Sequence, residues 1–276
     1  SCIWKDDFKA NVYEVYPQKA AKIYRDYKNA FPISYRDNFL AQVAVMDVGY
    51  IEKVLHDKGL AISFYRVMEE PKESLHMKLF HYENVLPLSS VLPILENMGL
   101  KVIDEHPYCI DIAKERVWIS DFGLSLQGKC QDLESYTDQF RSLFNRIWSN
   151  TCINDSLNHL VISVGLHWRQ IMLVRAYVKY YNQISNLYSQ RYIANTFIAY
   201  PEITAKMVEY FDAKFNPKRQ SDHQSDELQG LYDGLINAIS HVTQLDQDRI
   251  LRHFVQMIRA TIRSNYYQLD KNKNPK

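Results

Sequence analysis

Arginines in the second half of the chain are the side chains best suited to bind something. A guanidinium carries a permanent charge and a planar fork of donors that fits a carboxylate or a phosphate. Five of them are candidate interface residues: Arg169, Arg175, Arg191, Arg249 and Arg252. The first three lie among dense apolar residues between positions 160 and 193, where an unpaired charge would be costly. They therefore either form ion pairs with carboxylates such as Glu202 or contact another domain, and the same alternatives apply to the stripe over 249–263.

Sequence motifs of catalysis and of nucleotide binding are missing from the chain. The nine histidines form no H-E-x-x-H, and the eight glycines form neither G-x-G-x-x-G nor a G-x-x-x-x-G-K-[ST] phosphate loop. A G-x-S-x-G nucleophile elbow is missing too, since Ser163 and Gly165 lie in an apolar helical pattern. We therefore expect no catalytic residue, no metal site and no bound cofactor in this chain, and a structural or regulatory role within a larger protein.

Composition and charge exclude several other classes. The 276 residues carry a net charge of +1, and no run approaches the roughly 20 apolar residues that cross a bilayer. The four cysteines never form C-x-x-C, which favours reduced thiols in a cytoplasmic protein. The end of the chain is basic, but its aromatic residues follow a core periodicity instead of alternating with the basic ones. We expect neither a membrane nor a nucleic acid as a partner.

The first half of the chain must fold as helices and strands that share a core. Apolar periodicity predicts helices over 17–30 and 42–56 and a hairpin whose strands include 62–66 and 75–79. A serine cap and Gly99 predict a helix from about 89 to 98, with Pro93 in its first turn, and two more strands follow over 100–112 and 117–126. This ββαββ order with a preceding helix predicts an α+β, ferredoxin-like unit.

The second half of the chain reads as helix almost throughout. Apolar residues recur at steps of three and four, and Asp155 or its neighbour Asn154 is expected to cap a helix. The predicted helices cover 133–148, 157–166, 168–184, 189–199, 202–215, 226–242 and 246–266. Short connections between several amphipathic helices predict an all-α bundle. The one long polar connection, over 216–225, is expected to be a mobile surface loop.

Several stretches resemble one family. Residues 86–105, which read LPLSSVLPILENMGLKVIDE, and 117–124, which read VWISDFGL, are similar to the large bacterial NAD-specific glutamate dehydrogenases. The helical half agrees through GLHWR at 165–169, LVRAY at 173–177, SQRYI at 189–193, LDQDRILR at 245–252 and RSNYY at 263–267. The resemblance runs from about residue 31 to residue 268, in the same order and spacing as in that family.

This resemblance implies a division of the chain and a role for it. Residues 1–30 would be an N-terminal linker and helix, residues 31–128 an ACT-like domain, and residues 129–276 a helical domain leading toward a catalytic domain beyond Lys276. The parent enzyme would oxidatively deaminate L-glutamate to 2-oxoglutarate and ammonia with NAD as cofactor, and this segment would regulate or assemble it.

The resemblance also implies partners. They would be the catalytic domain of the same polypeptide, further copies in a homo-oligomer, and an amino-acid effector near residues 86–90 or 98–101. The alternative interpretation is a free-standing module that senses an amino acid or binds another protein.

Overall fold

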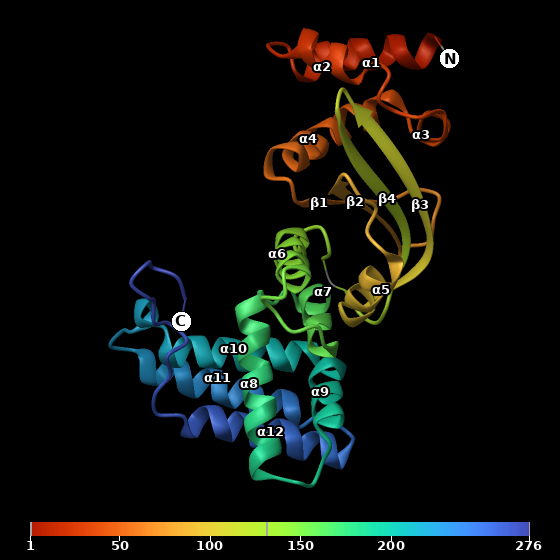
Figure 1. Cartoon of the computed structure of the whole chain (residues 1–276). Helices are drawn as coiled ribbons and strands as arrows, with labels where there is room; N and C mark the ends of the chain where they lie inside the picture. The colour runs from red at the N-terminus through yellow and green to blue at the C-terminus, as the bar shows by residue number, and fades with distance from the viewer. Residues whose placement is uncertain (1, 131, 276) are drawn as a thin grey trace. The chain divides into compact units, whose positions relative to one another are not determined.

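Two compact units make up the chain. The computed structural model describes residues 2–130 and 132–275 (Figure 1). Unit 1 comprises residues 1–96 and 100–127, and unit 2 comprises residues 97–99 and 128–276. The α+β class expected for the first unit and the helical class expected for the second are both confirmed.

Unit 1 contains four helices, four strands and most of a fifth helix within its described residues. The hairpin, the helix after it and the two long strands agree with the prediction to within a few residues. Pro93 lies inside its helix, beyond the first turn where it was expected. The elements are α1 (Cys2–Val15), α2 (Ala20–Tyr27), α3 (Ile33–Asn38), α4 (Ala41–Asp57), β1 (Leu60–Tyr65), β2 (Ser74–Tyr82), α5 (Leu88–Asn97), β3 (Leu100–Ile112) and β4 (Glu115–Leu126).

The sheet has the ferredoxin-like arrangement. Its strands lie in the order β1-β2-β4-β3, and each neighbouring pair is antiparallel. Consequently β2 and β3 run parallel with β4 between them, and α5 connects them, which is a split βαβ unit. A bulge between Val102 and Asp104 shifts the register of β3. Gly99 ends the preceding helix with φ of +89°, as expected of a left-handed stop.

A single hydrophobic cluster joins the amino-terminal helices to one face of the sheet. It includes Phe8 of α1, Tyr35 of α3 and Val48 of α4, together with Phe80 and Ile119 from the two central strands. Helices α1 and α3 were not predicted. They are part of this core nevertheless, because α1 buries Phe8 and α3 buries Tyr35 completely.

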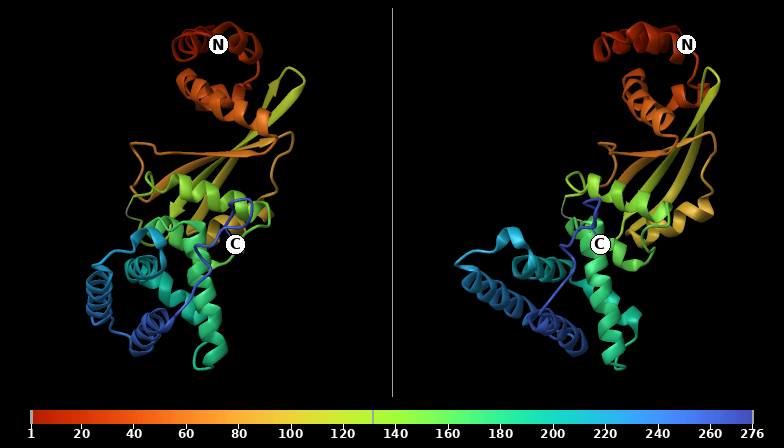
Figure 2. Two further views of the ribbon diagram at one scale, coloured as in Figure 1. Left: turned by 90° about the vertical axis from the view of Figure 1, so that its left-hand side faces the viewer. Right: turned by 60° about the vertical axis from the view of Figure 1, so that its left-hand side comes forward.

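Unit 2 is a helical bundle. Its elements are α6 (Thr137–Trp148), η1 (Ser156–His159), α7 (Leu160–Val164), α8 (Trp168–Ile184), α9 (Gln190–Ala199), α10 (Pro201–Phe215), η2 (Pro217–Arg219), α11 (Gln224–Ile239) and α12 (Leu245–Ala260). Helix α11 packs against α10 and α12, and the three lie side by side in both views of Figure 2. Asp155 caps η1 by accepting a hydrogen bond from the backbone N–H of Leu157, as predicted for this position.

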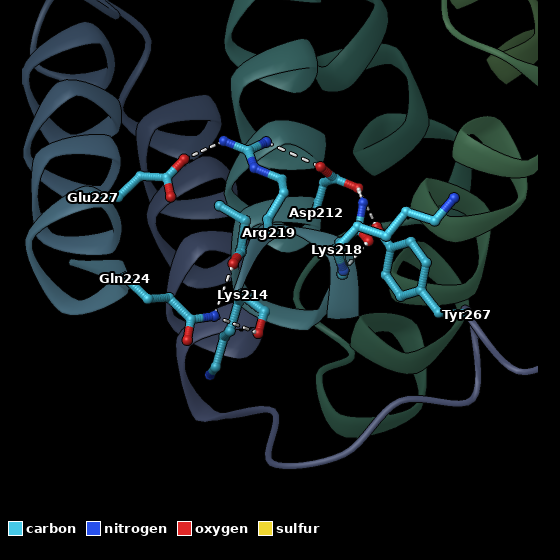
Figure 3. A network of polar contacts seen from close by, with 9 residues as sticks. Asp212, Lys214, Lys218, Arg219, Gln224, Glu227 and Tyr267 are labelled. Atoms are coloured by element: carbon cyan, nitrogen blue, oxygen red, sulfur yellow. Dashed lines mark hydrogen bonds and ion pairs between the residues drawn. The ribbon is translucent and has the colours of Figure 1, made fainter. Parts of the chain in front are cut away.

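One prediction for unit 2 was wrong. The last helix was expected to reach residue 266, but α12 ends at Ala260, and the chain then turns back so that Tyr266 and Tyr267 pack on Phe211 of α10. The connection after α10 was expected to be a mobile surface loop. Most of its residues are exposed, and Arg219 within it lies between Asp212 and Glu227 (Figure 3), while its mobility stays a prediction. None of the helices in the described residues combines the length and the hydropathy needed to cross a membrane.

Candidate functional site

A pocket in unit 2 gathers several arginine and aromatic side chains. Its volume is about 1070 Å³, and it is bounded by α8, by the end of α12 and by the segment that follows α12. Arg146 enters from α6, Arg169 from the first turn of α8, and Arg263 from the segment after α12. The aromatic part of the lining consists of Trp168, Tyr177, Tyr180, Phe211 and Tyr266. The pocket lining thus combines arginine side chains with aromatic ones.

Two of these arginines stack on aromatic rings. The guanidinium carbon of Arg146 lies 3.7 Å from the centre of the Trp168 ring. That of Arg169 lies 4.5 Å from the centre of the Tyr266 ring, and its Nη2 donates to the Tyr266 carbonyl oxygen. Stacking holds a guanidinium in place by its face and leaves the N–H groups at its edge free to point elsewhere.

The charge of the pocket is uncompensated within the described residues. No aspartate or glutamate lines it, and none of Arg146, Arg169 and Arg263 forms an ion pair there. The same two guanidiniums of Arg146 and Arg169 also affect the pKa of the neighbouring His167. Burial, followed by the charges of Arg146 and Arg169, lowers the pKa of its imidazole below the usual range. In addition to burial, the two guanidiniums therefore disfavour a further positive charge at the start of α8.

Arg175 lies elsewhere and has a structural role. Its side chain is 6% exposed, and its Nε and Nη2 donate to the two carboxylate oxygens of Asp155 at 2.6 and 2.8 Å. Nη2 also donates to Asn158 Oδ1 at 3.0 Å. The ion-pair interpretation is therefore confirmed for Arg175, although its partner is Asp155 and not Glu202. This contact ties α8 to the cap of η1.

The other three predicted arginines lie away from the pocket lining. Arg191 is exposed on α9. Arg252 donates from Nε to both oxygens of Asp248 at 3.0 Å, one turn earlier on α12. The Nη1 of Arg249 lies 3.9 Å from Asp246 Oδ1 on the same helix, and the Arg249 side chain is 63% exposed. The structure thus places only Arg169 of the five in the pocket, and an interface role for the five remains a prediction.

A buried charged cluster in unit 1 was not predicted from the sequence. Lys78 of β2 is 1% exposed, and its Nζ lies 2.6 Å from Asp47 Oδ2 of α4 and 3.9 Å from the centre of the Phe39 ring. The Tyr35 hydroxyl donates to the same Asp47 oxygen at 2.5 Å. The only signal in the sequence was a lysine between the apolar residues Met77 and Leu79, and its partner lies 31 positions away.

Family models for one enzyme match consecutive parts of the chain. "Glutamate dehydrogenase, helical motif 2" matches residues 17–54, and "Glutamate dehydrogenase, ACT3 domain" matches residues 59–136, which include the sheet. "Glutamate dehydrogenase, helical motif 3" matches residues 152–217. "Bacterial NAD-glutamate dehydrogenase, catalytic domain" matches residues 234–276, within the stretch expected to be wholly helical domain.

Curated relatives agree with these matches. An NAD-specific glutamate dehydrogenase of Halomonas elongata is 36% identical over 268 residues, and one of Pseudomonas aeruginosa is 34% identical over 274 residues. These alignments cover 96% and 98% of this chain but only 16% and 17% of the relatives. A third, from Mycobacterium tuberculosis, is 29% identical over 87% of this chain and 15% of its own length. The chain belongs to the family of NAD-specific glutamate dehydrogenases.

Proposed function

We propose that this chain is a non-catalytic regulatory or assembly segment of an NAD-dependent glutamate dehydrogenase. The parent enzyme would deaminate L-glutamate oxidatively to 2-oxoglutarate and ammonia, with NAD bound outside this segment. One observation carries the proposal. Relatives with that name align along nearly the whole chain, and the ACT3 family model falls on its four-stranded sheet. The chain spans about one sixth of those relatives, so the activity would be that of the larger protein.

The division of the chain into a sheet-containing domain and a helical domain is compatible with a regulatory or assembly segment. Residues 1–30 would be an N-terminal linker and helical part that shares a core with the ACT-like domain of residues 31–128, and residues 129–276 would be the helical domain that leads into the catalytic part. The match of 234–276 to the catalytic-domain model supports a direct covalent connection at that end. The partners would be this catalytic domain, further copies of the enzyme in a homo-oligomer, and an amino-acid effector, all in the cytoplasm.

An activity assay on the isolated 276-residue chain tests the proposal. Glutamate-dependent reduction of NAD should stay at the level of a blank, and calorimetric titration with NAD should give no binding heat. The parent enzyme, expressed from the complete reading frame and assayed in parallel, should reduce NAD with glutamate. Reduction by the isolated chain, or a parent that fails to oxidise glutamate, would refute the assignment.

The alternative, a free-standing sensing or interaction module, predicts different results. Its reading frame would stop without a catalytic domain, and amino acids titrated into the chain would bind without any dehydrogenase in the same polypeptide. Determining the complete reading frame therefore separates the two functions directly.

A further inference from the structure

We propose that the arginine pocket of unit 2 binds a small organic anion that carries carboxylate or phosphate groups on a flat apolar body. Arg146, Arg169 and Arg263 would hold the acidic groups, and the aromatic walls would cover the apolar part. This inference goes beyond the proposed function, because it concerns the helical unit and needs neither an ACT-type effector nor the dehydrogenase activity.

The charge of the lining is the first argument. Three arginines line one pocket, and none of its described lining residues is an aspartate or a glutamate. Elsewhere in the described part of unit 2, the buried Arg175 and the half-buried Arg219 have acidic partners. Arg175 pairs with Asp155, and Arg219 lies between Asp212 and Glu227. Like charges gathered without counterions are unfavourable, and an anion in the cavity would relieve that repulsion.

The geometry of the donors is the second argument. A guanidinium has five N–H donors, and Arg169 uses one of them in its bond to the Tyr266 carbonyl. Arg146 is fixed by its face against Trp168. Both groups are therefore oriented before any ligand arrives, which lowers the entropy lost when a carboxylate or phosphate accepts hydrogen bonds from them.

The size and walls of the cavity are the third argument. Pockets for small molecules measure about 300–1000 Å³ and are mostly apolar with a few fixed polar groups. This pocket, at about 1070 Å³, lies just above that range. Met172, Tyr180 and Ile184 lie at intervals of eight and four along α8, line the pocket and are 45%, 53% and 52% exposed. A flat apolar ligand that packs against these side chains would bury their exposed apolar surface.

Calorimetric titration of the full chain with two anionic probes tests the proposal. Phthalate represents the carboxylates and phenyl phosphate the phosphates, at a pH where both are dianions, and benzamide is the uncharged control. We expect at least one anion to bind, benzamide to show no saturable binding, and the affinity for the anion to fall as salt is raised. Whichever anion binds more tightly identifies the acidic group.

Three variants locate the site. Arg169→Gln and Arg263→Gln should each weaken anion binding about tenfold, the usual value of a charge-assisted hydrogen bond. Arg263 is exposed, so its replacement keeps the test valid even if Arg169→Gln disturbs the fold. The matched control is Arg249→Gln on α12, outside the pocket lining, which should leave the affinity unchanged within about twofold.

Three outcomes would overturn the proposal. The first is that neither anion binds, and the second is that benzamide binds as tightly as the anions. The third is that the three variants bind the anion with equal affinity. Self-association of the chain that Arg263→Gln abolishes, without any anion binding, would assign the pocket to an acidic protein surface and would likewise refute a small-molecule site.

Discussion

The ammonium of Lys78 and the carboxylate of Asp47 form an ion pair of 2.6 Å with side chains only 2% and 4% exposed. The pair joins the central strand β2 to helix α4. The rings of Tyr35, Phe39 and Tyr65 surround the ammonium at 5.4, 3.9 and 5.4 Å. Cation–π attraction adds to the ion pair where water is excluded. The buried ion pair therefore fixes the position of helix α4 on the sheet.

Breaking this pair should destabilise unit 1. Lys78→Met leaves the Asp47 carboxylate buried without its counterion, and we expect a loss of about 3–5 kcal/mol in the free energy of unfolding. Urea denaturation followed by hydrogen exchange over α4 and β2, which contribute to the same core, measures it. Lys22→Met, which removes the exposed pair with Asp26, is the control and should change little. Equal effects of the two replacements would contradict this account of Lys78.

Arg175 and Arg191 should differ sharply although both come from the same apolar stretch of sequence. Arg175→Ala removes the buried bidentate partner of Asp155 and should cost unit 2 about 3–5 kcal/mol. Arg191→Ala removes an exposed side chain and should stay within about 0.5 kcal/mol of the parent chain. Hydrogen exchange with mass spectrometry locates the change, which for Arg175→Ala should centre on η1 and α8. Similar protection in both variants would disprove a structural role for Arg175.

The network around Asp212 should make unit 2 sensitive to acid (Figure 3). Burial by itself would raise the pKa of Asp212, but hydrogen bonds from Tyr267, Arg219 and Asn216 outweigh it and lower this pKa below the usual value. A depressed pKa in the folded state stabilises the fold above the unfolded value of about 3.9, and this contribution is lost as the pH falls through the folded pKa.

Asp212→Asn should therefore remove part of the acid sensitivity. The free energy of unfolding of the parent chain, minus that of the variant, should be constant above about pH 5 and shrink below about pH 4. Urea titrations at several pH values, read by hydrogen exchange over α10 and residues 261–268, provide the measurement. Asp233→Asn, on the exposed side of α11, is the control. A difference that does not vary with pH would show that the Asp212 carboxylate is not the acid-sensitive group.

Two glycines should respond in opposite ways to replacement by alanine. Gly165 has φ of +69°, and a Cβ there would overlap the ring of Tyr136, so Gly165→Ala should cost about 2–4 kcal/mol. Gly230 lies in the interior of α11, and nothing lies within 4 Å of a Cβ added there. Gly230→Ala should therefore stabilise the helix by about 0.5–1 kcal/mol. Thermal unfolding of both variants checks this, and a destabilised Gly230→Ala chain would contradict it.

Local patterns predicted the elements whose signals lie within a short window. The hairpin, α5 with its Gly99 stop and the long helices α8 to α10 all have regular apolar spacing. Helix α1 gave a weak signal, because only Phe8 and Val12 among its described side chains are buried, and α3 has only six residues. The overextension of α12 had a similar cause. Apolar and aromatic residues continue past Ala260, but they pack on α8 and α10 after the chain turns.

Partners distant in sequence were beyond prediction from the sequence. The arginine stretch indicated that Arg175 needed a carboxylate, yet nothing distinguished Asp155, 20 positions earlier, from Glu202. The pocket was equally hidden, because Arg146, Arg169 and Arg263 come from three separate segments and only folding brings them to one cavity. Motif spacing reports neighbours along a helix or strand, whereas these sites depend on tertiary packing.

The hydrophobic cluster of unit 1 also bears on how such proteins can be dissected. One family model ends at residue 54 and the next begins at residue 59, yet Val48 and Phe80, on opposite sides of that border, belong to one cluster. A fragment cut at the border would expose this apolar surface to water and would tend to aggregate. The two modules recognised separately in sequence therefore form a single folding unit in this chain. A fragment designed to contain the complete cluster must include α1, because Phe8 and Val12 belong to it.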